Sequence, residues 1–200
     1  MAIDPVNFSD LAARDPREII QLTRAAWDSH SREYRIKIWG CNYWVDAAHG
    51  RIRTENKGER VLADYMDLFI VHYLMGTGSA DPANEWVSEK DIPGGSAFFR
   101  GPHTLPTKDI ARAFGEDMEG FAAVCTRLGG RPLALADAAF TFDITPKLPV
   151  AVLLWQGDED FGPDAGLLFD KTIARHLALD IIWALAALVC KTLTRTGGVD

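Results

Sequence analysis

Three strand-like segments follow one another in the last third of the chain, and this succession limits the choice of folds more than any other feature. Apolar and polar residues alternate over 138–144, residues 149–155 are apolar throughout, and residues 166–169 return as a hairpin after an acidic turn. Strands and helices do not alternate here as βαβ units. The pattern therefore favours an antiparallel or mixed sheet with packed helices over a parallel sheet.

Two long apolar segments are expected to form helices that pack on this sheet. Residues 60–75 are apolar on nearly every side, which is typical of a central helix, and the glycines of residues 76–78 end it. Residues 176–193 predict a long final helix. Residues 56–58 (Asn-Lys-Gly) mark a break before the central helix.

The N-terminal part of the chain predicts a capped helix and a small set of strands. Asp15 suits the cap of a helix over residues 16–27, which has proline at its first position. Residues 34–38 alternate as a half-buried strand, and residues 42–47 are its hairpin partner. Residues 51–54 add a short third strand.

The middle of the chain predicts shorter elements. Residues 85–88 resemble a short strand or turn, and residues 97–100 a short strand, while Thr107 suits the cap of a helix that a second helix around Phe121 follows. Together these elements predict a single α+β domain over residues 1–200. Its mixed, mostly antiparallel sheet packs against the central and C-terminal helices.

The composition excludes several classes of protein. The 200 residues are 48% hydrophobic and 24% charged, which is ordinary for a globular chain and unlike a disordered or collagen-like one. The net charge of −7 does not favour binding to nucleic acid or to an anionic membrane surface, since both carry negative charge. The longest apolar run, residues 181–190, is well short of the roughly 20 residues that a membrane span needs.

The cysteines and the first residues indicate a reducing compartment. Cys41, Cys125 and Cys190 lie far apart, so neither a disulfide framework nor a CxxC metal motif is indicated. The sequence begins without the basic and apolar regions of a signal peptide. We therefore predict a cytoplasmic protein with free thiols.

Aromatic, glycine and histidine residues in the middle of the chain are candidates for binding a small ligand. Aromatic rings beside a flexible backbone can form the walls of a site for a flat, apolar ligand, and histidines can serve as axial ligands or bases. The candidate ligand-binding residues are Trp86, Gly94, Gly95, Phe98, His72 and His103. The same residues also fit a purely structural interpretation, in which the rings and His72 belong to the core and the glycines form a turn.

Two groups of charged residues are further candidates. Asp158, Glu159 and Asp160 follow a strand, where three carboxylates can bind a hard cation or raise one another's pKa. Their structural interpretation is a solvated turn. His176 and Asp180 stand four positions apart near the start of the predicted final helix, where they would face each other as a local pair.

Several segments in order resemble the bacterial and archaeal family known as domain-of-unknown-function family 3786. They are the LFIVHYL stretch from Leu68, the EWVSEKDIPGG stretch from Glu85, the LLWQGDEDF stretch from Leu153 and the LFD stretch from Leu168. Asp160 stands where the family pattern has a glutamate. The resemblance covers most of the chain from the central helix to the last one. It implies a link to anaerobic redox or corrinoid metabolism but no assigned activity, and this chain lacks the cysteine-rich segments that some relatives carry.

Three functional hypotheses follow, and the sequence itself identifies no cofactor and no reaction. The first is a binding module for a small ligand with an apolar face, such as a tetrapyrrole or corrinoid, which requires Trp86, Phe98, His72 and His103 to line one cavity. The second is a structural or partner-docking domain without a small ligand. The third is a metal-assisted hydrolase or lyase. The partners that these hypotheses allow are a small molecule, a redox protein or a second copy of the chain.

Overall fold

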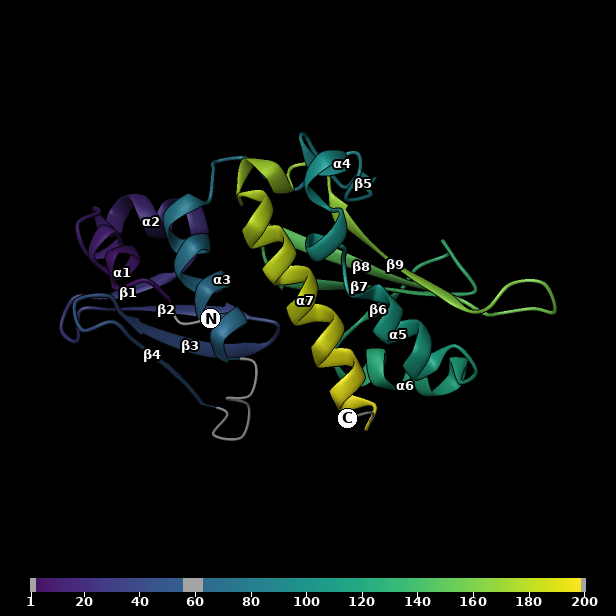
Figure 1. Cartoon of the computed structure of the whole chain (residues 1–200). Coiled ribbons are helices and arrows are strands. Elements are labelled where there is room, and N and C mark those ends of the chain that lie inside the picture. Colours follow the sequence, from purple (N-terminus) through teal and green to yellow (C-terminus); the bar gives the residue numbers. More distant parts are fainter. Residues whose placement is uncertain (1–2, 56–62, 199–200) are drawn as a thin grey trace.

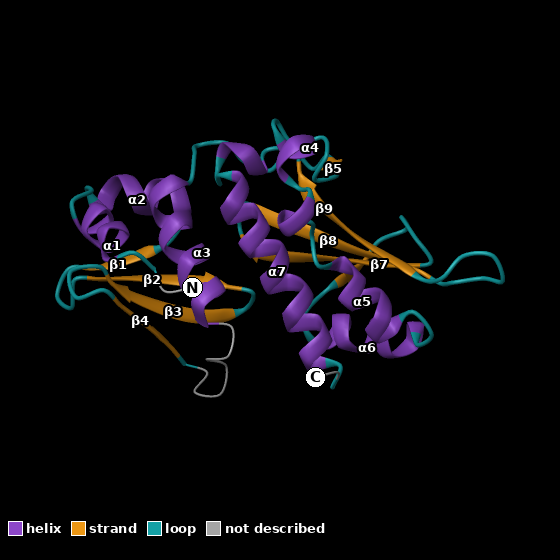
Figure 2. Cartoon of the chain, in the orientation of Figure 1, coloured by secondary structure: helices purple, strands orange, loops and turns teal. Residues whose placement is uncertain are grey.

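Two antiparallel sheets and the helices packed on them make up the fold of the computed structural model, which describes residues 3–55 and 63–198 (Figure 1; Figure 2). The predicted α+β class is confirmed. The strands form two sheets rather than one, because the N-terminal and C-terminal hairpins pair only among themselves. The predicted break at residues 56–58 lies outside the described residues.

The first sheet has four strands in sequence order, because each strand pairs with the one before it through a short turn. They are β1 (Ala26–Asp28), β2 (Glu33–Ile38), β3 (Cys41–Asp46) and β4 (Arg51–Thr54). The predicted alternation is confirmed in β2, where the side chains of Tyr34, Ile36 and Ile38 are buried.

Two short helices precede this sheet, α1 (Pro5–Ala12) and α2 (Pro16–Thr23). The side chain of Asp15 accepts a hydrogen bond from the backbone N–H of Arg17, which confirms the predicted cap. The helix ends four residues earlier than predicted, because Arg24 takes a left-handed conformation with φ of 59° and the chain then enters β1. Helix α1 was not predicted.

The second sheet has the strand order β5-β9-β8-β7-β6. Its strands are β5 (Trp86–Val87), β6 (Arg131–Pro132), β7 (Ala138–Thr145), β8 (Leu148–Trp155) and β9 (Asp164–Asp170). Its helix-covered face packs against α5 (Thr107–Phe114), α6 (Met118–Arg127) and α7 (Leu179–Thr196), as Figure 1 shows. Its open face carries a separate small apolar cluster that includes Ala139, Ala151, Leu153 and Trp86.

Helix α3 (Ala63–Gly76) packs beside α7 and also contacts α1 and α2 (Figure 1). Its side chains at 69, 70, 71, 73 and 74 are buried, which confirms the predicted central helix. Helix α7 begins at Leu179, because Ala178 is extended with ψ of 160°. His176 therefore precedes the helix, and the predicted i,i+4 pair of His176 with Asp180 is wrong.

The segment predicted as a strand at residues 97–100 is helical instead. Residues Gly95–Phe98 form α4, which the 3-10 helix η2 (Gly101–His103) follows. The backbone N–H groups of Phe98 and Phe99 donate to the carbonyls of Gly94 and Gly95, so local hydrogen bonds replace the strand pairing that this segment lacks. None of the described helices is long and apolar enough to cross a membrane.

Candidate functional site

The predicted ligand-binding residues lie at three separate places. Trp86 lines a pocket on the open face of the second sheet. His72 lines a different pocket, at the end of α3. The rings of Phe98 and His103 stack on each other with centroids 4.5 Å apart, and His103 meets the ring of Trp183 edge to face. The structure thus does not bring Trp86, Phe98, His72 and His103 to one cavity, so the ligand site that was predicted from these residues does not form among the described residues.

The two candidate glycines have a role in the backbone. Gly94 has φ of +79°, a conformation that favours glycine, at the start of α4. A Cβ atom on Gly95 would overlap the carbonyl oxygen of Glu89. Both glycines therefore allow a tight turn, and neither lines the pocket that contains Trp86.

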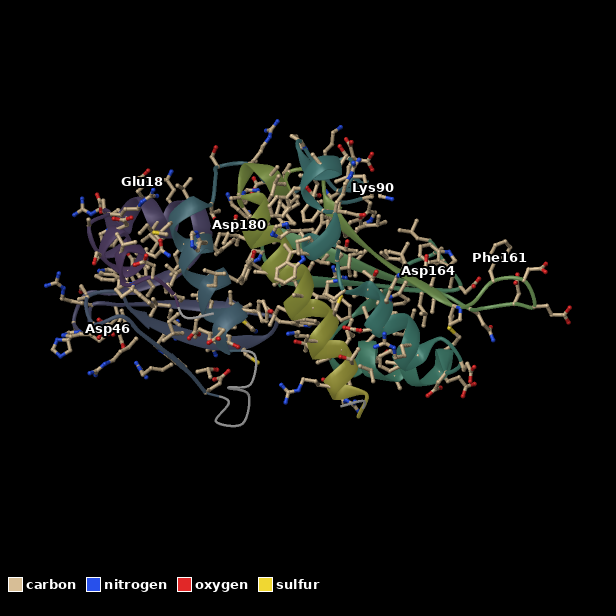
Figure 3. All side chains as sticks on the ribbon, viewed as in Figure 1. Glu18, Asp46, Lys90, Phe161, Asp164 and Asp180 are labelled. Carbon is tan, nitrogen blue, oxygen red and sulfur yellow. The ribbon has the colours of Figure 1, made fainter. Side chains whose placement is uncertain are left out.

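The acidic segment forms the exposed loop between β8 and β9. Asp158 accepts backbone hydrogen bonds from Asp160 and Phe161 at 2.9 and 2.8 Å, which orders the loop as a turn. Figure 3 shows Phe161 near the end of this loop, away from the helices. Among the described residues, no group of three or more His, Cys, Asp or Glu side chains is placed to hold a metal ion. The structure therefore gathers no ligand set around Asp158, Glu159 and Asp160.

The pocket that contains Trp86 has a volume of about 740 Å³ and is a candidate site for a small molecule. This volume lies within the range of about 300–1,000 Å³ that small-molecule sites occupy. Its apolar walls come from two tryptophans, three prolines and an isoleucine, and its polar groups from both sheets. The lining residues are Lys37, Trp39, Gly40, Pro82, Asn84, Trp86, Arg131, Thr141, Asp143, Ile144, Thr145, Pro146, Pro149 and Asp170.

A turn of the first sheet forms one wall of this pocket. Trp39 and Gly40, which join β2 to β3, both have positive φ, as a two-residue hairpin turn requires. The backbone N–H of Trp39 donates to the carbonyl of Ile144 at 2.9 Å, and its indole N–H donates to the carbonyl of Leu128 at 3.0 Å. These two hydrogen bonds fix the hairpin against β7 and the C-terminal end of α6, so this wall belongs to the fold and does not depend on a ligand.

Thr141 of β7 supplies an unsatisfied polar atom at this pocket. Its side chain is buried, and its hydroxyl oxygen has no hydrogen-bond partner among the residues that the structure describes. A buried polar group left in this state costs about 1–3 kcal/mol. The hydroxyl oxygen is itself enclosed, so a ligand in the pocket does not contact it directly.

An ion pair borders the same pocket. Arg131 of β6 donates to both carboxylate oxygens of Asp143 at 2.7 and 3.0 Å. The Arg131 guanidinium holds the pKa of the Asp143 carboxyl below its usual value, although partial burial opposes this. Because the two opposite charges are paired, they add no strong electrostatic field to the pocket. They instead give its edge hydrogen-bonding groups in fixed positions.

A buried carboxylate closes one end of the pocket. Asp170 accepts hydrogen bonds from the backbone of Ala83 and Asn84 and from both the backbone and the hydroxyl of Thr172. Burial by itself raises the pKa of Asp170, but these hydrogen bonds outweigh it and hold the pKa below its usual value. Asp170 is thus an ionised anchor that ties the loop before β5 to the end of β9.

Most of these pocket residues were missed by the sequence analysis. One signal was present for Thr141, since the alternation that buries Phe140 and Phe142 on the helix side puts Thr141 on the opposite face. No sequence pattern predicts that the turn at Trp39 packs beside Ile144, which lies about a hundred residues further along the chain. That contact depends on how the two sheets pack.

The fold and this pocket define an α+β protein with two antiparallel sheets, one of which has an open face hollowed by a small-molecule-sized pocket. A comparison with protein families matches residues 15–192 to the family described as Domain of unknown function (DUF3786). The chain belongs to this family, which confirms the resemblance found in the sequence. Searches of the curated proteins and of the solved structures found no match.

Proposed function

We propose that this protein is a binding module for a small molecule with one flat apolar face, such as a tetrapyrrole or a corrinoid, and that it binds in the pocket beside Trp86. The single observation that carries the proposal is a pocket of about 740 Å³ with Trp and Pro walls. Flat apolar ligands pack on such walls, and a few polar groups fix their orientation.

The residues that line the pocket determine which kinds of contact such a ligand could make. Among the residues that the structure describes, no histidine, cysteine or methionine lines this pocket. A metal-bearing tetrapyrrole in this pocket would therefore be held by its faces and by hydrogen bonds at its edge. His72 and His103, predicted as axial ligands or bases, lie elsewhere. In this proposal Trp86 packs against the ligand, and Lys37 binds an anionic edge group.

Absorbance titration of the purified apo-protein with haem and with cobalamin tests the proposal. We expect a saturable spectral change with at least one of the two ligands and at least a tenfold loss of affinity in Trp86→Ala, since a buried aromatic contact contributes on the order of 1.4 kcal/mol or more. Trp155→Ala is the matched control, because Trp155 lies on the open face of β8 and outside the pocket.

Two results would remove the proposal. The first is no spectral change at saturating concentrations of either ligand. The second is an equal loss of affinity in Trp86→Ala and Trp155→Ala, which would show that binding occurs away from the pocket. Retention of the far-ultraviolet circular dichroism spectrum in both variants verifies that each is folded.

A docking function is the second candidate, and the exposed loop between β8 and β9 favours it. Phe161 is 75% exposed, which is unusual for a phenylalanine, and the hydrogen bonds to Asp158 hold the turn beside it. Light scattering coupled to size exclusion tests the version in which a second copy is the partner. A monomer at every concentration would eliminate that version.

A further inference from the structure

The loop between β8 and β9, residues 156–163, carries the most exposed large apolar side chain of the described residues. This side chain is Phe161, which is 75% exposed, although contact between its ring and water is unfavourable. Asp158 fixes the turn, since its carboxylate accepts a hydrogen bond from the backbone N–H of Phe161 at 2.8 Å and its own N–H donates to the Phe161 carbonyl. Pro163 packs on the end of α5, where a Cβ atom on Gly115 would lie 2.3 Å from its ring. The loop is therefore ordered before it meets a partner, which lowers the entropic cost of docking.

Carboxylates without lysine or arginine neighbours in the sequence surround Phe161. Residues 158–160 are Asp-Glu-Asp, and the whole stretch 148–170 contains no lysine or arginine. Residues 114–126, which begin beside the Pro163 contact, contain three more carboxylates and again no lysine or arginine. A surface that receives this loop should therefore combine an apolar pocket with basic side chains at its rim.

A second pocket of the molecule has an apolar floor. It has a volume of about 670 Å³ and lies where the C-terminal end of α3 meets the segment that leads into α7. Met75, Leu177 and Ile181 line it, and Leu177 and Ile181 belong to the hydrophobic core. A phenylalanine ring inserted here packs on core side chains and is removed from water.

The rim of this second pocket carries arginine side chains. Arg14 and Arg175 both line the pocket and are both exposed. A guanidinium group binds a carboxylate through parallel hydrogen bonds, so both residues suit the acidic side chains of the loop. Asp10 also lines the pocket and Asp180 stands in the first turn of α7, so the net charge of the rim is small. Attraction at the rim therefore depends on local pairing with the two arginines.

The loop and the second pocket lie far apart in one molecule. Figure 3 shows Phe161 near the end of the loop, well away from Asp180 at the start of α7, where the pocket lies. We propose that the loop docks into the second pocket of another copy of this chain. Phe161 then packs on the apolar floor, and the carboxylates of residues 158–160 pair with Arg14 and Arg175. This inference rests on the docking function proposed above and does not depend on a small ligand.

Analytical ultracentrifugation of the full chain, at concentrations up to the millimolar range and at two salt concentrations, tests this proposal. We expect reversible association that weakens as salt rises, because salt screens exposed pairs of carboxylate and guanidinium groups. Phe161→Ala should weaken it at least tenfold, since a buried aromatic anchor dominates contacts of this kind. Leu135→Ala is the matched control, because Leu135 is an exposed apolar residue outside the loop, and it should associate as the wild type does.

Variants of the pocket test the other half of the contact. Arg175→Gln should weaken association about threefold, whereas Arg195→Gln removes the same charge at the other end of α7 and should leave it unchanged. Asp10→Asn should strengthen association, because it removes a carboxylate that faces the acidic loop. Ala174→Glu should prevent it, since a longer, negatively charged side chain then stands in the pocket. All four residues are exposed, so the variants should fold.

A mixture of two variants separates this contact from general association. Phe161→Ala keeps the pocket and Ala174→Glu keeps the loop, so the mixture should form a complex of one copy of each, although neither associates alone. The proposal is overturned if the wild type is monomeric at every concentration, if the mixture does not associate, or if Leu135→Ala loses as much affinity as Phe161→Ala.

Two further outcomes distinguish this inference from the proposed functions. A loss in Phe161→Ala without any change in the pocket variants would overturn the second pocket as the acceptor but leave docking through the loop in place. A monomeric wild type that still binds haem or cobalamin would overturn the inference and leave the small-ligand function standing.

Discussion

The guanidinium group of Arg131 binds the carboxylate of Asp143 through two hydrogen bonds, at 2.7 and 3.0 Å, across the neighbouring strands β6 and β7. The pair lies at the edge of the candidate site and is more than half exposed on both sides. Exposed pairs of this kind contribute less than about 1 kcal/mol to stability, because solvent screens the charges.

Asp143→Asn should therefore lower the free energy of unfolding only slightly near neutral pH, and the loss should disappear in acid. The pKa of Asp143 is lower in the folded protein, so the pair stabilises the fold above the unfolded pKa of about 3.9 and stops doing so as pH falls through the folded pKa. Urea unfolding at several pH values checks this. A difference between variant and wild type that grows on acidification would contradict it.

Asp170→Asn should destabilise the protein by about 1.5–3 kcal/mol, since hydrogen bonds to a buried charged group contribute that much. The amide that replaces one carboxylate oxygen presents N–H groups where donors already point, so the loop at Ala83 and Asn84 loses its attachment. Urea unfolding measures the loss, and hydrogen exchange at Asn84 locates it. Asp164→Asn, at the exposed end of the same strand, is the control and should cost far less.

Gly95→Ala should destabilise the protein by about 1–3 kcal/mol, because the added Cβ overlaps the carbonyl oxygen of Glu89 and the backbone must move. Gly162→Ala is the control, since a Cβ there meets no atom within 4 Å. Thermal unfolding followed by circular dichroism compares the two variants. Equal melting temperatures would show that the close approach at Gly95 is not required.

Stability should fall as pH decreases from about 7 to 5, in part because of His72. Burial lowers the pKa of His72, and Asp180 only partly opposes this, so the unfolded chain takes up its proton at a higher pH than the folded protein does. His72→Gln should reduce this pH dependence, whereas Asp180→Asn should increase it by lowering the pKa of His72 further. Urea unfolding across this range tests both, and changes of the same sign would contradict the assignment.

Thr141→Val should leave the stability unchanged or raise it by up to about 1 kcal/mol, because it removes a buried hydroxyl that has no partner. Thr145→Val on the same strand is the matched control. The Thr145 hydroxyl accepts a hydrogen bond from the backbone of Lys147, so its loss should cost about 1 kcal/mol. Urea unfolding ranks the two variants, and a loss in Thr141→Val as large as in Thr145→Val would mean that the Thr141 hydroxyl is satisfied.

The local pattern of the sequence determined most of the secondary structure. Strands β2, β7 and β8 and helix α3 were predicted from the period of their apolar residues, because that period reflects which side chains a strand or helix can bury. The cap at Asp15 was predicted for the same kind of reason, since it depends on residues only two positions apart. The prediction was wrong at residues 97–100, where short-range hydrogen bonds at Gly94 and Gly95 outweighed the aromatic content.

Only the tertiary structure decided where these elements meet. The sequence grouped Trp86 with Phe98 because they are close along the chain, yet Trp86 points to the open face of its sheet, and Phe98 stacks on His103 on the helix side. The pocket beside Trp86 forms because the turn at Trp39 hydrogen-bonds to Ile144, and that contact joins two sheets that are distant in sequence. Local periodicity sets which face of an element is apolar, but only the packing of many such faces decides which polar groups they enclose.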